Sequence, residues 1–312
     1  MEYIKLKNSD LKVSRLCVGG CPMGGHGWGK VKEENLIETV KVALQEGVNF
    51  FDNADTYGLG KSEELLGKAL GSNRHEAVIG TKFGVRVENG RTFYDNSPEW
   101  IRQALENSLK RLNTDYIDLY QIHYRDGITP IGDVIETLEK LKDKGYIRYI
   151  GLSNIHEEDV KELEKYNNKF VSFQNEYSLA CRRNEKEMFD ISKKLEVTPL
   201  TWGSLGQGIL TGKYDENVKF EANDRRSRDI YVNFHGEKLI KNLKIVEELK
   251  KISNEIDKPV SAVAIRWILD YLSDSVVIAG VKNINQLNGN REALGWNLSE
   301  EHIKILEMIS KE

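Results

Sequence analysis

Eight short runs of β-branched and other apolar residues recur along the chain, and each is followed by a segment with apolar residues at helical spacing. Neighbouring parallel strands need a crossover connection, which a helix supplies, so this alternation favours a parallel sheet. Eight units suffice to close such a sheet, which predicts a (β/α)₈ TIM barrel; an open doubly wound sheet is the alternative. The predicted strands cover residues 15–20, 49–55, 77–83, 116–123, 147–154, 170–176, 197–204 and 275–282.

Signals at the ends of these segments support the assignment. Ser97 followed by Pro98 predicts the start of a helix. Gly145 is expected to end a later helix, which contains Val134 and Leu141. Residues 3–13 alternate around a turn sequence, which predicts a small hairpin at the floor of the barrel. After the eighth strand, a helical pattern is expected to continue through Leu294.

The segment between the seventh and eighth predicted strands is far longer than the others. Its first part, residues 215–231, is a charged loop, and two helical patterns separated before Pro259 follow it. A loop of this length is expected to serve a function. Because no linker or low-complexity tract interrupts the chain, we expect residues 1–312 to form one domain.

Composition narrows the classes of partner. The 312 residues include 45 Lys+Arg and 49 Asp+Glu, a net charge of -4, which provides no basic surface for nucleic acid or anionic lipid. The chain has three cysteines and no apolar run long enough to span a bilayer, and its first residues are charged where a secretory signal needs an apolar core. We therefore expect a cytoplasmic protein without a disulfide framework or zinc site.

Ionisable side chains stand where three successive predicted strands end. Asp52 ends the second strand, Lys82 the third and His123 the fourth, and Tyr57 lies just beyond the second. The carboxyl ends of barrel strands face one another at the active-site mouth, so we expect these four side chains to meet there. Taken singly, each also has a structural interpretation, as a turn residue, a strand end, an exposed aromatic or a satisfied histidine.

Together these four residues have a definite chemical use. A phenol has a pKa of about 10 and is a poor acid at neutral pH unless a cation stabilises the phenolate. Lys82 supplies that charge, Asp52 fixes Lys82, and His123 donates to or orients a carbonyl beside Tyr57. The set suits protonation of a developing alkoxide. A Schiff base on Lys82, as in an isomerase, is an alternative chemistry.

Six segments of the chain resemble successive signatures of the aldo-keto reductase superfamily: FFDNADTYGLGKSEELLGKAL, VIGTKFG, YIDLYQIH, GYIRYIGLSN, FQNEYS and LGQGILTGKY. They occur in the order of the family, and the resemblance spans residues 3–296. It implies that Asp52, Tyr57, Lys82 and His123 form a catalytic tetrad with Tyr57 as general acid.

The reaction that this resemblance implies is direct hydride transfer from NADPH to an aldehyde or ketone, of the alcohol dehydrogenase (NADP⁺) type, without a metal. The resemblance extends to potassium-channel β-subunits. A cofactor-binding regulatory protein with little turnover is therefore the alternative function.

The resemblance also implies a cofactor site. Ser153, Asn154 and Gln174 match positions that hold the nicotinamide carboxamide, and Trp202 stands where the family usually has a tyrosine that stacks on the nicotinamide. Lys282 matches a position that receives the adenosine 2′-phosphate, which favours NADPH while leaving NADH possible; a solvated lysine is the alternative. The other residues of the implied site are Gly203, Ser204, Leu205, Gly206, Gly208, Gly280, Gln286 and Asn290.

Residues after the first and third strands predict a substrate pocket for a small-molecule carbonyl. Cys21 is a further lining candidate, without a neighbour in sequence that indicates a reactive thiolate. The loop at 215–231 either contacts a phosphate or is solvated. Neither the substrate nor the oligomeric state follows from these residues. The pocket candidates are Met23, His26, Trp28 and Tyr94, and the loop candidates are Arg225, Arg226 and Arg228.

Overall fold

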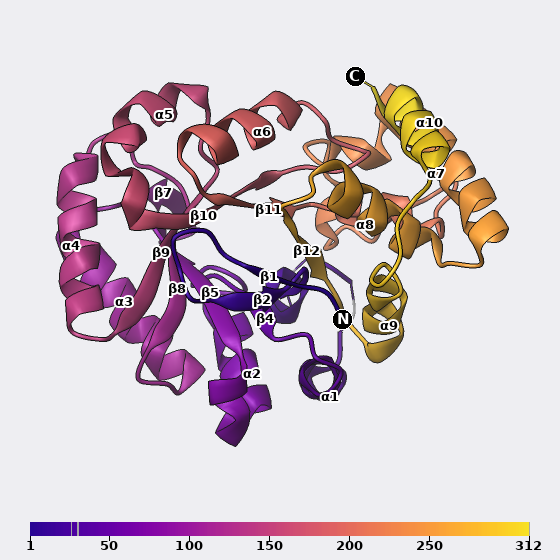
Figure 1. The fold of residues 1–312 in the computed structure, drawn as a ribbon. Coiled ribbons are helices and arrows are strands. Elements are labelled where there is room, and N and C mark those ends of the chain that lie inside the picture. Colours follow the sequence, from indigo (N-terminus) through magenta and orange to yellow (C-terminus); the bar gives the residue numbers. More distant parts are fainter. Residues whose placement is uncertain (26, 30, 312) are drawn as a thin grey trace.

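Eight parallel strands close into a barrel in the computed structural model, which describes residues 1–25, 27–29 and 31–311 (Figure 1). Pairing of β12 with β3, from Val277 and Leu16 to Gly280 and Gly19, closes the ring. Every barrel strand lies within a predicted run, so the predicted barrel is confirmed and the open sheet is wrong. The strands are β3 (Leu16–Gly19), β4 (Phe50–Asp52), β5 (Val78–Phe83), β8 (Ile117–Ile122), β9 (Ile147–Ser153), β10 (Phe170–Glu176), β11 (Thr198–Trp202) and β12 (Val276–Gly280).

Helices follow the strands and surround the barrel (Figure 1). Ser97 caps α3 as predicted, because its side chain accepts a hydrogen bond from the amide of Trp100 at 3.3 Å. The predicted continuation of α9 to Leu294 is wrong: the helix ends at Arg291, and Gly295 follows with a φ of +90°. The helices are α1 (Glu33–Gln45), α2 (Lys61–Leu70), α3 (Pro98–Leu112), α4 (Ile131–Asp143), α5 (Glu157–Leu163), α6 (Glu185–Lys194), α7 (Gly236–Ile256), α8 (Val260–Tyr271), α9 (Ile284–Arg291) and α10 (Glu300–Ser310).

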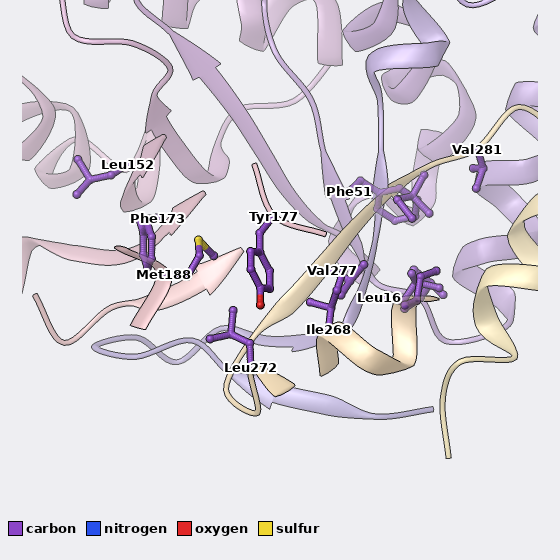
Figure 2. Packing of buried hydrophobic residues seen from close by; sticks show 14 of the residues in the cluster. Leu16, Phe51, Leu152, Phe173, Tyr177, Met188, Ile268, Leu272, Val277 and Val281 are labelled. Carbon is purple, nitrogen blue, oxygen red and sulfur yellow. The ribbon is translucent and has the colours of Figure 1, made fainter. Parts of the chain in front are cut away.

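The hydrophobic core has two parts. The larger lies between the barrel and its helices, where strand residues such as Phe51 and Val277 pack with helix residues such as Ile268 (Figure 2). The smaller fills the barrel floor, where Leu6 and Leu11 of the N-terminal hairpin join barrel residues. This hairpin pairs β1 (Tyr3–Lys5) with β2 (Lys12–Ser14), as predicted, and it crosses the end of the barrel opposite the polar strand ends.

Two connections at the carboxyl ends of the strands are elaborated. A second hairpin, which was not predicted although Asn89-Gly90 marks its turn, joins β6 (Val85–Glu88) to β7 (Arg91–Tyr94) directly after β5. The long connection after β11 contains short 3₁₀ segments, then α7 and α8, which separate at Pro259 as predicted. Among the described residues, no helix is both long and apolar enough to cross a membrane.

Candidate active site

A cavity of about 630 Å³ opens at the carboxyl ends of the barrel strands. Its wall runs from Asp52, Tyr57 and His123 to α9. Loops far apart in sequence thus meet around one space, as a barrel requires. The predicted residues in its wall are Trp28, Asp52, Tyr57, His123, Ser153, Asn154, Gln174, Trp202, Gly203, Ser204, Leu205, Gly208, Gly280, Lys282, Gln286 and Asn290.

Some predicted residues lie elsewhere. Met23 is only 2% exposed and packs into the core between barrel and helices, so the structure places it outside the pocket wall. Lys82 is buried behind Tyr57, and Gly206 is buried and does not line the cavity. Arg228 is exposed, whereas Arg225 and Arg226 line the cavity. His26 lies outside the described residues.

The ion pair between Lys82 and Asp52 is the most deeply buried part of the site. Lys82 Nζ lies 2.6 Å from Asp52 Oδ2 and also donates to the carbonyl oxygen of Asn53 at 2.7 Å. The two side chains are 1% and 3% exposed, so water does not screen the pair. The remaining polar neighbour is Tyr57, whose Oη lies 3.4 Å from Lys82 Nζ.

Tyr57 is held between a cation and an imidazole. Lys82 Nζ lies 5.0 Å from the centroid of the Tyr57 ring, and the His123 ring meets that ring edge to face at 6.1 Å. Burial raises the pKa of Tyr57 well above its usual value, so the hydroxyl is protonated at neutral pH. In the resting site, burial therefore outweighs the nearby cation.

His123 is neutral in this environment. Burial, followed by the positive charge of Lys82, lowers the pKa of His123 well below its usual value. Its Nδ1 is buried and has no hydrogen-bond partner in the part of the chain that the structure describes. The ring stacks on Tyr124 at 5.0 Å, and that residue also lines the cavity. A neutral imidazole thus lies in the cavity wall beside Tyr57.

The side-chain amides of Gln121 and Gln174 form a pair behind Asp52, and this pair was not predicted. Gln121 Nε2 and Gln174 Nε2 both donate to Asp52 Oδ1, at 3.0 and 2.9 Å. Gln174 was predicted from the resemblance, but Gln121 was missed. Alternate residues of a strand face the same side, and Gln121 lies two positions before His123. This spacing was the signal that could have identified Gln121.

The predicted nicotinamide contacts converge beside His123. Asn154 has a φ of +51°, and its side-chain amide donates to the His123 carbonyl and to Ser153 Oγ, each at 3.0 Å. Trp202 lies in the wall across the cavity, and its Nε1 is buried without a partner among the described residues. This end of the cavity therefore combines amides, a hydroxyl and an aromatic face.

The glycine loop after β11 turns through three consecutive residues with positive φ: Gly206, Gln207 and Gly208. Glycine adopts such a left-handed conformation without strain, and the amides of Gly206 and Gly208 donate to the carbonyls of Gly203 and Leu205 at 2.7 and 2.9 Å. The hydroxyl of Ser204 is engaged within the protein, because its Oγ donates toward the carbonyls of Thr201 and Ile278. Ser204 thus ties β11 to β12, while the backbone around it borders the cavity.

Cations gather at the far end of the cavity. Lys282 Nζ donates to the Trp28 carbonyl, and burial, followed by repulsion from Arg226 and Lys213, lowers the pKa of Lys282. Arg226 is paired with Asp224 at 2.6 Å. Lys213, which the motif LGQGILTGKY contains, also lines the wall and was missed as a site residue. Mutual repulsion among cations favours an anionic ligand between them.

Aromatic side chains and the thiol of Cys21 lie in the cavity wall around Trp28. Tyr94 does not line the cavity; it is 48% exposed and stacks at 5.0 Å on Tyr124, which does. Trp28 meets Tyr231 edge to face at 6.1 Å. Burial raises the pKa of the Cys21 thiol, so this cavity residue is not a reactive thiolate.

Asp55, three residues beyond Asp52, is expected to make stability depend on pH. Burial, followed by the negative charge of Glu63, raises the pKa of Asp55 to about 8. An unfolded aspartate has a pKa of about 3.9, so folding takes up a proton and stability falls as pH rises from about 4 to about 8. Asp55→Asn removes this titration. The urea midpoint of this variant minus that of wild type should be larger at pH 8 than at pH 5. An equal difference at both pH values would contradict the raised pKa of Asp55.

Comparison with known proteins places this geometry in context. A model of the Aldo/keto reductase family matches residues 15–311. The chain is 35% identical to aldo-keto reductase YhdN of Bacillus subtilis over 99% of this chain and 93% of that protein. It is 32% identical to aldo-keto reductase yakc (NADP(+)) of Schizosaccharomyces pombe over 91% of this chain and 85% of that protein. The structure of a glycerol dehydrogenase from Gluconobacter oxydans matches at 33% identity with a TM-score of 0.88, covering 98% and 94% of the two chains.

Proposed function

Because the chain belongs to the aldo/keto reductase family, we propose that it reduces aldehydes or ketones to alcohols with NADPH, with Tyr57 as the general acid and residues 1–312 acting as one domain. The observation that carries this proposal is the contact of Tyr57 Oη, in the wall of the cavity, with Lys82 of the buried Lys82–Asp52 pair. A protonated phenol beside a fixed cation is suited to give a proton to an oxygen that becomes negative.

The cavity fits a dinucleotide. Its reacting end offers Asn154 and Gln174 to an amide group, and Trp202 offers a flat aromatic face. The loop at Gly203–Gly208 borders the cavity, and its amides other than those of Gly206 and Gly208 suit a pyrophosphate. Lys213 and Lys282 stand toward the far end, where a phosphate would offset their repulsion. The relative named as NADP(+)-dependent supports NADPH as the cofactor.

The chain's own residues then have distinct roles. Bound NADPH supplies the hydride. Tyr57 donates its proton to the carbonyl oxygen, and Lys82 stabilises the phenolate that remains. Asp52 keeps Lys82 in place, so the cation need not reorganise during proton transfer. Neutral His123 donates an N–H to the same oxygen and fixes its position without adding a second full charge beside Lys82.

The experiment that tests the function follows NADPH absorbance in the presence of aromatic and aliphatic aldehydes and ketones. The proposal expects consumption of NADPH that depends on the carbonyl, with formation of the matching alcohol. Normal binding of NADPH without turnover on any carbonyl would contradict the enzymatic proposal and favour a regulatory, cofactor-binding protein.

Lys282 is expected to select NADPH over NADH. A hydrogen bond to a charged group contributes about 1.5–3 kcal/mol, so Lys282→Ala should weaken NADPH binding about 10- to 100-fold and NADH binding by less than about threefold. Fluorescence titration with both cofactors measures this. Lys258→Ala, which removes a surface lysine paired with Glu292, is the control and should change neither affinity. Equal losses for both cofactors would show that Lys282 acts on the fold of the site and not on the 2′-phosphate.

A further inference from the structure

Three polar side chains at the centre of the barrel form a closed hydrogen-bonded unit. Asp52 Oδ1 accepts from Gln121 Nε2 at 3.0 Å and from Gln174 Nε2 at 2.9 Å. Gln174 Nε2 also donates to Gln121 Oε1 at 2.7 Å. The three residues are at most 2% exposed. Their hydrogen bonds are therefore made with one another, away from bulk water.

The chemistry of this unit fixes which way each amide faces. An ionised carboxylate can only accept, so both amides must turn their NH₂ groups toward Asp52. Gln174 then uses both of its N–H bonds inside the barrel, one on Asp52 and one on Gln121. Its carbonyl oxygen is the atom left for the cavity that Gln174 lines. A ligand at this point must therefore donate a hydrogen bond to Gln174.

The barrel makes room for Gln121 on both sides. A Cβ atom at Gly151, on β9, would lie 2.9 Å from Gln121 Cγ, closer than such atoms approach in proteins. A Cβ atom at Gly80, on β5, would lie 3.2 Å from Gln121 Nε2. Glycine on both neighbouring strands thus leaves the space that Gln121 needs to reach Asp52.

We propose that Gln121 is a positioning residue: it holds the Gln174 amide with its oxygen toward the cavity and so sets the seat of the nicotinamide carboxamide. The inference rests on the proposed function, since it assumes that NADPH binds with its carboxamide beside Gln174. Asp52 also binds Lys82, which contacts Tyr57. The same hydrogen-bonded unit therefore positions both the nicotinamide ring and the general acid.

The test compares two ligands that differ in the nicotinamide half. Gln121→Met keeps the length of the side chain and removes both polar atoms. One net hydrogen bond corresponds to about a 3- to 10-fold change in affinity. We expect NADP⁺ to bind the variant about 3- to 10-fold more weakly, while adenosine 2′,5′-bisphosphate, which lacks nicotinamide, binds as it does to wild type. Isothermal titration measures both affinities.

Leu119→Ala is the matched control, because Leu119 lies on the same strand and face as Gln121 and is fully buried. It lowers stability through a cavity but removes no polar atom. Its ratio of NADP⁺ to adenosine bisphosphate affinity should equal that of wild type. A second measurement combines Gln121→Met with Gln174→Met: if Gln121 acts through Gln174, the first change should have little further effect in the second background.

The outcomes separate the two proposals. If wild type binds NADP⁺ and catalyses reduction but Gln121→Met leaves the affinity ratio unchanged, the inference about Gln121 is wrong and the proposed function stands. If wild type binds neither ligand, the proposed function fails and takes this inference with it. Should Gln121→Met not yield folded protein, Gln121→Asn, which withdraws the amide by one methylene, gives the same comparison.

Discussion

Tyr57→Phe is expected to lower kcat for carbonyl reduction by about 10³-fold or more while changing the affinity for NADPH by less than about twofold. General acid catalysis contributes about 10²–10⁴ to a rate, and the Tyr57 hydroxyl is the acid in the proposed reaction. The phenylalanine ring preserves the edge-to-face contact with His123 and the position over Lys82. Because only the proton donor is removed, the variant should still bind NADPH but should not reduce the carbonyl at an appreciable rate.

Single-turnover measurement of NADPH oxidation, with cofactor affinity measured separately, tests this expectation. Tyr124→Phe is the matched control, because Tyr124 is a second phenol in the cavity wall and stacks on the other side of His123. It should lower the rate by less than about tenfold. A Tyr57→Phe variant with a rate close to wild type would exclude Tyr57 as the acid, and equal losses in both variants would indicate a shared structural effect.

Much of the barrel could be predicted from sequence because its signal is local and repeated. Each parallel strand is buried on both faces and reads as an apolar run, and each crossover helix has its own period. The residues at strand ends follow from that register, which is why the sequence predicts Asp52, Lys82 and His123 together. These three side chains meet because the barrel closes and brings the ends of its strands together, whatever residues neighbour them in sequence.

Other features depend on contacts that no local pattern records. Met23 follows the first strand, as a pocket residue would, yet the 3₁₀ turn at Cys21–Gly24 directs it into the core. The hairpin β6–β7 carries a local signal in Asn89-Gly90, but the stacking of Tyr94 on Tyr124 joins two separate loops, which no local pattern records. The protonated state of Tyr57 depends on burial by the assembled site, which sequence does not measure.

Lys82→Met is expected to have the second large effect, on activity and on stability together. Loss of the cation removes the stabilisation of the Tyr57 phenolate, which should lower kcat by about 10²–10⁴-fold. It also leaves Asp52 as a buried carboxylate without its cation. Breaking a buried pair in this way costs about 3–5 kcal/mol of unfolding free energy. Urea denaturation and single-turnover kinetics on the same preparations measure the two effects.

A double variant, Asp52→Asn with Lys82→Met, separates charge from packing. The Asp52→Asn change would keep an oxygen that accepts from Gln121 and Gln174 but would remove the charge. If the unpaired carboxylate causes the instability, the double variant should recover at least half of the lost unfolding free energy and remain inactive. A double variant as unstable as Lys82→Met would instead assign the loss to the missing contact between Lys82 and the Asn53 carbonyl. Recovery of stability without activity is the result that identifies the buried pair as a support for proton transfer.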